Sequence, residues 1–195
     1  MNDLITRYKK LLQENWTLEE DTTCLTWFNG CDIETAVSLF GADPRSAKPM
    51  DYPDARDEAC VAFQSDIQSN LVLLGTAGTW NIAVEPYGWE GLEREVIEGL
   101  AGDGDAISLL IAAEAIDRLV YAHKGTFCYL LRRLDDREYP VPDSLEAHME
   151  DLPLFGHISS TDWRPSALAL IERFTGAGLT WEWLSRHHTL YQIRR

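Results

Sequence analysis

Five glutamates in one short stretch are the residues of this chain that come nearest to catalytic chemistry. They are Glu85, Glu90, Glu93, Glu95 and Glu98. Paired carboxylates perform acid–base catalysis when one keeps its proton while the other stays ionised. Glu85, however, precedes Pro86 at the end of a predicted strand, and the other four fit a turn and the solvated face of a helix. Such a pattern is typical of a protein surface, so we expect no catalytic pair.

The histidines and cysteines do not have the spacing of a metal site. His148 and His157 are nine residues apart, and His187 and His188 are adjacent, so neither pair has metal-ligand geometry. The cysteines lack CxxC spacing and lie in apolar segments, which is typical of small buried hydrophobic residues. They are Cys24, Cys31, Cys60 and Cys128. The glycine-rich segment 99–104 lacks the order of a phosphate loop. We therefore expect no metal and no cofactor.

The aromatic residues favour binding over catalysis. Trp27 and Trp80 lie in apolar, strand-like runs and are expected in the core, whereas Trp89 lies in a turn between a predicted strand and a helix. An aromatic side chain rimmed by acids is typical of a binding hot spot for a basic protein surface. The alternative is that Trp89 folds back and caps the sheet. The predicted partner-binding residues are Glu85, Tyr87, Trp89, Glu90 and Glu93.

The charge of the chain limits its partners. The sequence has 32 acidic and 17 basic residues, a formal net charge of −15, and residues 14–182 alone carry −20. An acidic surface repels phosphate groups, so we expect no direct binding to nucleic acid or to anionic membranes. It would attract a basic protein. The alternative is that the acidity serves solubility only.

Length and hydrophobicity indicate one domain. The 195 residues, 45% of them hydrophobic, suffice for a core. No apolar run approaches the roughly 20 residues that cross a bilayer. The N-terminal residues lack the continuous apolar segment of a secretion signal. We expect a cytoplasmic protein.

The pattern of segments predicts an α+β fold. Residues 1–14 have helical spacing, 42–56 contain three prolines and are predicted as an irregular loop, and 143–187 are predicted as C-terminal helices. Residues 71–132 predict a hairpin with a turn at 75–78, a helix, and a meander. The expected fold is a mostly antiparallel sheet at about 71–131, packed by N- and C-terminal helices in a single domain.

Shorter signals add further elements. Asp32 and Thr180 are placed to cap helices, and Gly176 to end one. A helix is predicted from Ala55, a short strand at 24–28, and another at 188–193.

Several motifs together resemble a known family. They are Cys24-Leu-Thr-Trp-Phe28, Leu39-Phe-Gly-Ala-Asp43, Trp80-Asn-Ile-Ala-Val-Glu-Pro-Tyr-Gly88, the small-residue segment near Gly102, and Phe174-Thr-Gly-Ala-Gly-Leu-Thr180. In this order they look like the bacterial family called domain of unknown function 6461, which is frequent in actinomycete genomes. The resemblance runs from about Asp21 to the C-terminus. It brings no established activity, cofactor or catalytic residue. It implies a small accessory single-domain protein, compatible with an immunity-like role beside a toxin.

Taken together, the residues predict a non-enzymatic acidic interaction protein, immunity-like, that neutralises a basic protein partner such as a toxin. One alternative is a DNA-mimicking or regulatory acidic protein, whose carboxylates would be spaced like phosphates. Another is a small-molecule-binding protein or an enzyme of unknown reaction.

Overall fold

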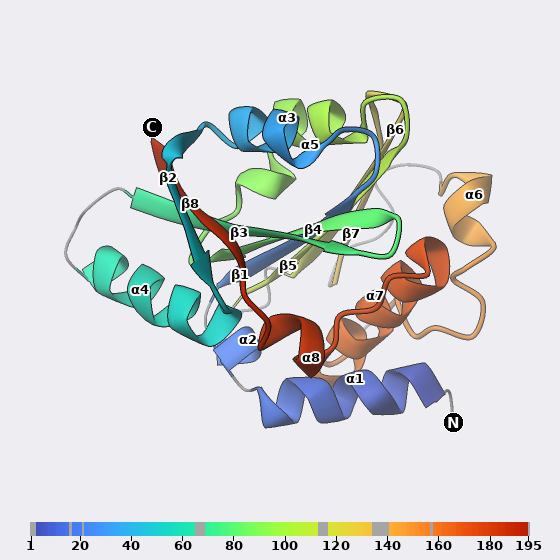
Figure 1. Cartoon of the computed structure of the whole chain (residues 1–195). Helices are drawn as coiled ribbons and strands as arrows, with labels where there is room; N and C mark the ends of the chain where they lie inside the picture. Colours follow the sequence, from blue (N-terminus) through green and yellow to red (C-terminus); the bar gives the residue numbers. More distant parts are fainter. Residues whose placement is uncertain are drawn as a thin grey trace.

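The computed structural model places one eight-stranded sheet between two layers of helices (Figure 1). It describes residues 3–15, 17–20, 22–64, 69–112, 117–133, 141–156 and 158–194. The strands are β1 (Thr23–Phe28), β2 (Ala42–Met50), β3 (Ser69–Ala77), β4 (Trp80–Pro86), β5 (Asp105–Ile111), β6 (Arg118–His123), β7 (Thr126–Arg132) and β8 (His188–Arg194). The helices are α1 (Asp3–Glu14), α2 (Thr17–Glu20), α3 (Ile33–Leu39), α4 (Tyr52–Gln64), the 3-10 turn η1 (Glu90–Leu92), α5 (Arg94–Ala101), α6 (Asp143–Glu146), α7 (Ser160–Thr175) and α8 (Trp181–Leu184).

The sheet has the order β2-β8-β3-β4-β1-β5-β6-β7, and every recorded pair is antiparallel. The predicted α+β class and antiparallel sheet in a single domain are confirmed. The predicted hairpin, helix and meander of residues 71–132 are β3–β4, α5 and β5–β7. The sheet is larger than predicted, because β1, β2 and β8 also belong to it.

Each face of the sheet has its own core. On one face Leu25, Trp27 and Ile107 pack with α1, α4 and α7, while on the other Phe28 and Ala83 pack against α3 and α5. Figure 1 shows α3 and α5 above the sheet and α1, α4 and α7 below it. Strand β1 is buried on both faces. The strands near the centre therefore have apolar residues at nearly every position, as expected for a sheet covered on both sides.

The prediction of an irregular loop at residues 42–56 is wrong. Residues 42–50 form β2, an edge strand that pairs with β8, and α4 begins at Tyr52. Pro44 and Pro49 are compatible with a strand here because an edge strand has backbone groups that need no partner. Pro53 occupies the first turn of α4, where a helix does not need its N–H.

The β3–β4 turn also differs from the prediction. The register pairs Ala77 with Trp80, so the loop is Gly78-Thr79 and Gly75 lies within β3. A Cβ atom on residue 75 would lie 2.1 Å from Nδ1 of His188, on the neighbouring strand β8. Glycine is therefore needed at position 75 for close packing of a side chain rather than for a turn.

Helix α7 is attached to the sheet by a buried ion cluster. Asp117, just before β6, accepts hydrogen bonds from Nε of Arg133 at 3.0 Å and Nε of Arg164 at 3.1 Å. Its Oδ1 also accepts from the N–H of Ala112 at 3.0 Å, and Arg164 donates to the Ala112 carbonyl at 2.7 Å. The aspartate side chain is fully buried. One carboxylate thus joins α7, β7 and the end of β5.

Candidate interaction surface

Three aromatic side chains are associated with the end of β4, because Tyr87 and Trp89 follow this strand in the sequence and Phe63 stacks on Tyr87. Phe63, in the last turn of α4, is 68% exposed, and Trp89 is 44% exposed. Tyr87 lies half-buried beside Phe63, with the two rings stacked at 5.3 Å between centroids. We call Phe63, Tyr87 and Trp89 the aromatic patch. Large exposed apolar side chains that lie together are characteristic of binding sites.

Two buried carboxyl groups lie beneath this patch. Glu85 is fully buried and Glu90 is 5% exposed. The Glu85 oxygens accept hydrogen bonds from the N–H groups of Glu90 at 2.8 Å and Gly91 at 2.9 Å. The Glu90 oxygens accept from the N–H of Trp89 at 3.1 Å and from the Asn70 amide at 2.6 Å. The carboxyl pair therefore binds three successive backbone N–H groups and fixes the turn that exposes Trp89.

Further polar groups complete the cluster below η1. The Ser108 hydroxyl lies 2.8 Å from both the Gly91 carbonyl and Thr26 Oγ1. Cys24 Sγ lies 3.8 Å from the same Thr26 oxygen. A Cβ atom at position 91 would come within 2.3 Å of Thr26 Oγ1, so only glycine lets the backbone approach the sheet this closely. The turn is packed onto β1 and β5 without space for a side chain.

The pKa values of the two carboxyl groups are shifted in opposite directions. Burial raises the pKa of Glu85 well above its ordinary value, and the neighbouring Glu90 raises it further. Burial also opposes ionisation of Glu90, but hydrogen bonds from Glu85, Asn70 and the Trp89 N–H outweigh it and lower the Glu90 pKa. Because two like charges in contact cannot both ionise cheaply, Glu85 keeps its proton to a higher pH than Glu90 does. Burial likewise raises the pKa of the Cys24 thiol.

The structure separates the five predicted partner-binding residues into two groups. Trp89 and Glu93 are exposed and Tyr87 is half-buried. Glu85 and Glu90 are buried, so the expectation that Glu90 lies on a solvated surface is wrong. They act on the turn from inside, through its backbone N–H groups. Of the other glutamates, Glu95 is exposed and Glu98 half-buried.

Phe63 was missed because the sequence predicts a helix there without showing which side faces solvent. The burial of Glu85 and Glu90 was not predicted for another reason. Along β4, Asn81, Ala83 and Glu85 alternate with apolar residues, which normally indicates a solvated face. Here that face is covered by α3 and α5. A signal was nonetheless present, since glycines at 88 and 91 flank Glu90 and permit close backbone packing.

The site does not resemble an active site or a metal centre. The Glu85 carboxyl is enclosed and its oxygens already accept backbone hydrogen bonds, so a substrate cannot reach it with the turn in place. Within the described ranges, no group of three or more His, Cys, Asp or Glu residues is arranged to hold a metal ion. His157 lies outside those ranges. All four cysteines are free thiols, of which Cys24 is buried and Cys31, Cys60 and Cys128 are half-buried.

Among the helices in the described part of the chain, none is long and apolar enough to cross a membrane.

A comparison with known protein families finds a match. The model of a family of unknown function, DUF6461, matches residues 11–192, nearly the whole chain. The matched range includes the carboxyl pair and the aromatic patch. No curated protein and no solved structure matches the chain. The resemblance expected from the sequence motifs is thus confirmed, and the chain belongs to the family of unknown function DUF6461.

Proposed function

We propose that this protein is a non-enzymatic, acidic interaction protein that binds a basic protein partner through the aromatic patch and the adjacent Glu93. The observation that carries the proposal is the exposure of Trp89 on a turn whose backbone N–H groups are bound by buried carboxyl groups, together with the exposed Phe63 that stacks on the nearby Tyr87. Trp and Tyr are enriched among the residues that dominate interface energy. A turn that is already ordered loses little entropy on binding, which favours affinity.

The charge supports a basic partner. At a formal charge of −15 the chain attracts cationic surfaces over a distance of about 8–10 Å at physiological salt. Glu93 and Glu95 are exposed and follow Trp89 within six residues of the sequence. Electrostatic attraction of this kind accelerates association, whereas a buried aromatic contact slows dissociation.

An immunity-like role follows from these two properties. Toxins that act on nucleic acid must bind phosphate, so their active surfaces are basic. An acidic protein with a rigid aromatic anchor is suited to cover such a surface. In this proposal the protein neutralises its partner by occupying the surface that otherwise binds nucleic acid.

The test starts with capture of partners from an extract of the source cells on three immobilised proteins. These are the wild type, Trp89→Ala and the matched control Trp181→Ala, since Trp181 is 48% exposed on a different element. We expect a basic protein bound by the wild type and by the control but not by Trp89→Ala. Equal capture by all three proteins would remove the aromatic patch from the proposal.

Kinetics with the purified partner then separate charge from packing. Glu93→Lys combined with Glu95→Lys is expected to slow association, and rising salt to do the same, while Trp89→Ala acts mainly on dissociation. Glu90 is not used for charge reversal because it is buried. An association rate that does not change between low and physiological salt would show that the acidity serves solubility alone.

A further inference from the structure

The turn η1 is attached to the sheet mainly by polar groups. Of its three residues, Glu90 and Gly91 are buried and Leu92 is half-buried, so no large apolar side chain of the turn is enclosed in the core. The N–H groups of Trp89, Glu90 and Gly91 donate to the two carboxyl groups. The Gly91 carbonyl accepts from the Ser108 hydroxyl at 2.8 Å. A change of charge in the carboxyl pair therefore acts directly on the turn.

The two carboxyl groups are close enough to repel each other. A Cβ atom on Gly88 would lie 3.2 Å from Oε2 of Glu85 and 3.2 Å from Oε2 of Glu90, so both oxygens lie beside this glycine. The N–H groups that Glu85 binds favour its charged form, but burial and the neighbouring Glu90 outweigh them and raise its pKa. Loss of the Glu85 proton would enclose two negative charges together, which is costly.

Among the described residues, the groups that face the pair would not balance a second negative charge. They are Cys24 and Thr26 of β1, Asn70 of β3 and Ser108 of β5. Only Cys24 titrates, and burial raises the pKa of its thiol, so it stays neutral at neutral pH. Arg94, in the first turn of α5, pairs with Glu98 instead. Water would stabilise the second charge, and it reaches the pair only when the turn opens.

We propose that the carboxyl pair is a pH-sensitive latch on Trp89, closed while the pair keeps one proton and opened when that proton is lost. The open turn exposes both carboxylates to water and no longer holds Trp89 in one position. The consequence for binding rests on the proposed function, because a partner that contacts Trp89 would bind less tightly as the pH rises. The latch itself requires no partner.

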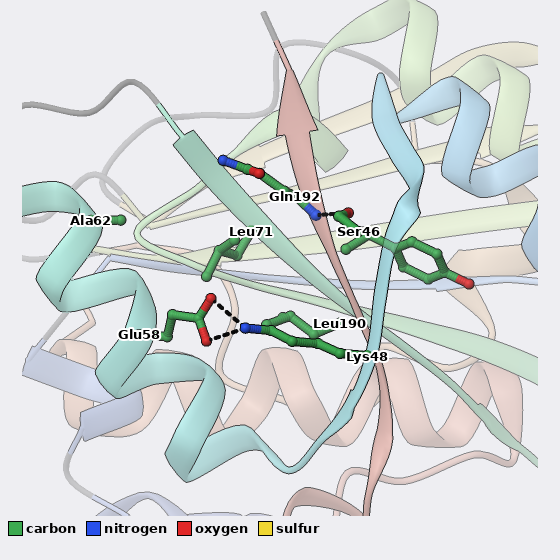
Figure 2. Close-up of a pocket in the computed structure, with 8 residues that line it drawn as sticks. Ser46, Lys48, Glu58, Ala62, Leu71, Leu190 and Gln192 are labelled. Atoms are coloured by element: carbon green, nitrogen blue, oxygen red, sulfur yellow. Dashed lines mark hydrogen bonds and ion pairs between the residues drawn. The ribbon is translucent and has the colours of Figure 1, made fainter.

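The other exposed ring of the aromatic patch is held separately from the latch. Phe63 belongs to α4. Lys48 Nζ of the edge strand β2 donates to both Glu58 oxygens of this helix, at 2.7 and 2.6 Å (Figure 2). Lys48→Gln therefore disturbs the attachment of α4 and leaves the carboxyl pair intact, which makes it the matched control.

Amide hydrogen exchange of the full chain, followed by NMR between about pH 5 and pH 8, measures the opening of the turn. We expect the protection factors of the Trp89, Glu90 and Gly91 N–H groups to fall as the pH rises. The fall should be up to about tenfold per pH unit until Glu85 ionises in the closed turn. Its sign follows from the raised Glu85 pKa, because the closed turn binds this proton more tightly than the open turn does. The N–H groups of β1 should keep their protection.

Four variants assign the effect. Glu85→Gln cannot ionise and should remove the pH dependence, whereas Glu90→Gln removes the neighbouring charge and should make the total fall smaller. Cys24→Ala removes the thiol and, like Lys48→Gln, should keep the fall of the wild type. Thermal unfolding shows whether each variant is folded, and Glu90→Gln decides the matter if Glu85→Gln does not fold.

Three results would overturn the latch. They are constant protection of the turn in the wild type, a full fall in a folded Glu85→Gln or Glu90→Gln variant, and loss of the fall in Cys24→Ala. The latch and the proposed function fail separately. Constant protection would remove the latch and leave the aromatic patch in place, whereas partner capture that does not depend on Trp89 would remove the patch and leave the latch.

Discussion

The Glu85–Glu90 pair and the ion cluster around Asp117 are both buried polar groups at the edge of the core, and they balance their charges differently. Asp117 is paired with Arg133 and Arg164, whose guanidinium groups remain charged at any physiological pH. In the carboxyl pair the Glu85 pKa is instead raised, and backbone N–H groups serve as the donors. The first arrangement fixes a helix to the sheet permanently. The second fixes a turn in a way that depends on pH.

The comparison indicates why the two clusters lie where they do. The Asp117 cluster connects elements of the hydrophobic core, where a change of charge would weaken the whole domain. The carboxyl pair lies under a short surface turn, where a change of charge acts first on the display of Trp89. The turn can therefore be held with one negative charge beneath it, on Glu90, rather than with two.

The largest loss of stability is expected when the ion cluster around Asp117 is broken. Asp117→Asn leaves Arg133 and Arg164 buried without a counter-charge, so we expect the free energy of unfolding to fall by about 3–5 kcal/mol. Urea unfolding measures it. Asp57→Asn breaks an exposed ion pair as the control and should change the value by less than about 1 kcal/mol. A loss below about 1 kcal/mol for Asp117→Asn would show that the arginines find other partners.

The next largest loss of stability is expected when the packing of the turn at Gly91 is disturbed. Gly91→Ala places a methyl group 2.3 Å from Thr26 Oγ1 and 3.0 Å from Glu85 Oε1, so we expect a loss of about 1–3 kcal/mol. The double variant with Thr26→Ala removes the closest atom. In a double-mutant cycle measured by urea unfolding, the two changes should couple favourably. Strictly additive losses would mean that the strain lies elsewhere.

The carboxyl pair should give a distinctive pH dependence. The Glu85 pKa is raised in the folded state, so above the unfolded value the unfolded chain loses this proton first and stability falls as pH rises. The contribution is up to about 1.4 kcal/mol per pH unit until folded Glu85 ionises. The lowered Glu90 pKa has the opposite sign, with stability lost as pH falls through its folded pKa.

Glu85→Gln isolates this contribution. Urea unfolding of the wild type and of the variant between pH 5 and 8 should show a flatter curve for the variant, because glutamine does not titrate. Other titrating groups affect both proteins and cancel in the difference. Parallel curves would mean that Glu85 is not the group that keeps the proton.

The smallest effect is expected at the aromatic patch. Trp89→Ala removes a side chain that is 44% exposed, so we expect a stability change below about 1 kcal/mol. Trp27→Ala is the contrasting variant, because Trp27 is fully buried and donates to the Ala177 carbonyl at 2.8 Å. It should cost about 3–5 kcal/mol. Thermal or urea unfolding of both variants tests whether the aromatic patch contributes little to the stability of the fold.

Local rules predicted the ends of several helices correctly. Asp32 accepts from the Thr35 N–H at 2.8 Å, and Thr180 accepts from the Trp183 N–H at 3.1 Å, each as an N-terminal cap. Gly176 ends α7 in the left-handed conformation. These predictions succeeded because capping depends on residues within one turn of each other.

Predictions that depend on distant neighbours failed. Residues 42–50 form a strand only because β8, about 140 residues later, pairs with them. Gly75 appeared to mark a turn, yet it makes room for His188. The roles of Glu85 and Glu90 depend on helices that cover the second face of the sheet. No local pattern contains that information.

The order of the strands has a consequence for synthesis. Strand β8 lies between β2 and β3 and is the only recorded partner of β2. During synthesis on the ribosome, β2 emerges long before β8. The hydrogen-bonding edge of β2 therefore stays unpaired until β8 has been made. Prolines at 44 and 49 and the charges of Arg45 and Lys48 make that edge a poor template for another chain. The two prolines that made β2 look like a loop would thus help to protect the nascent protein from aggregation until β8 has been made.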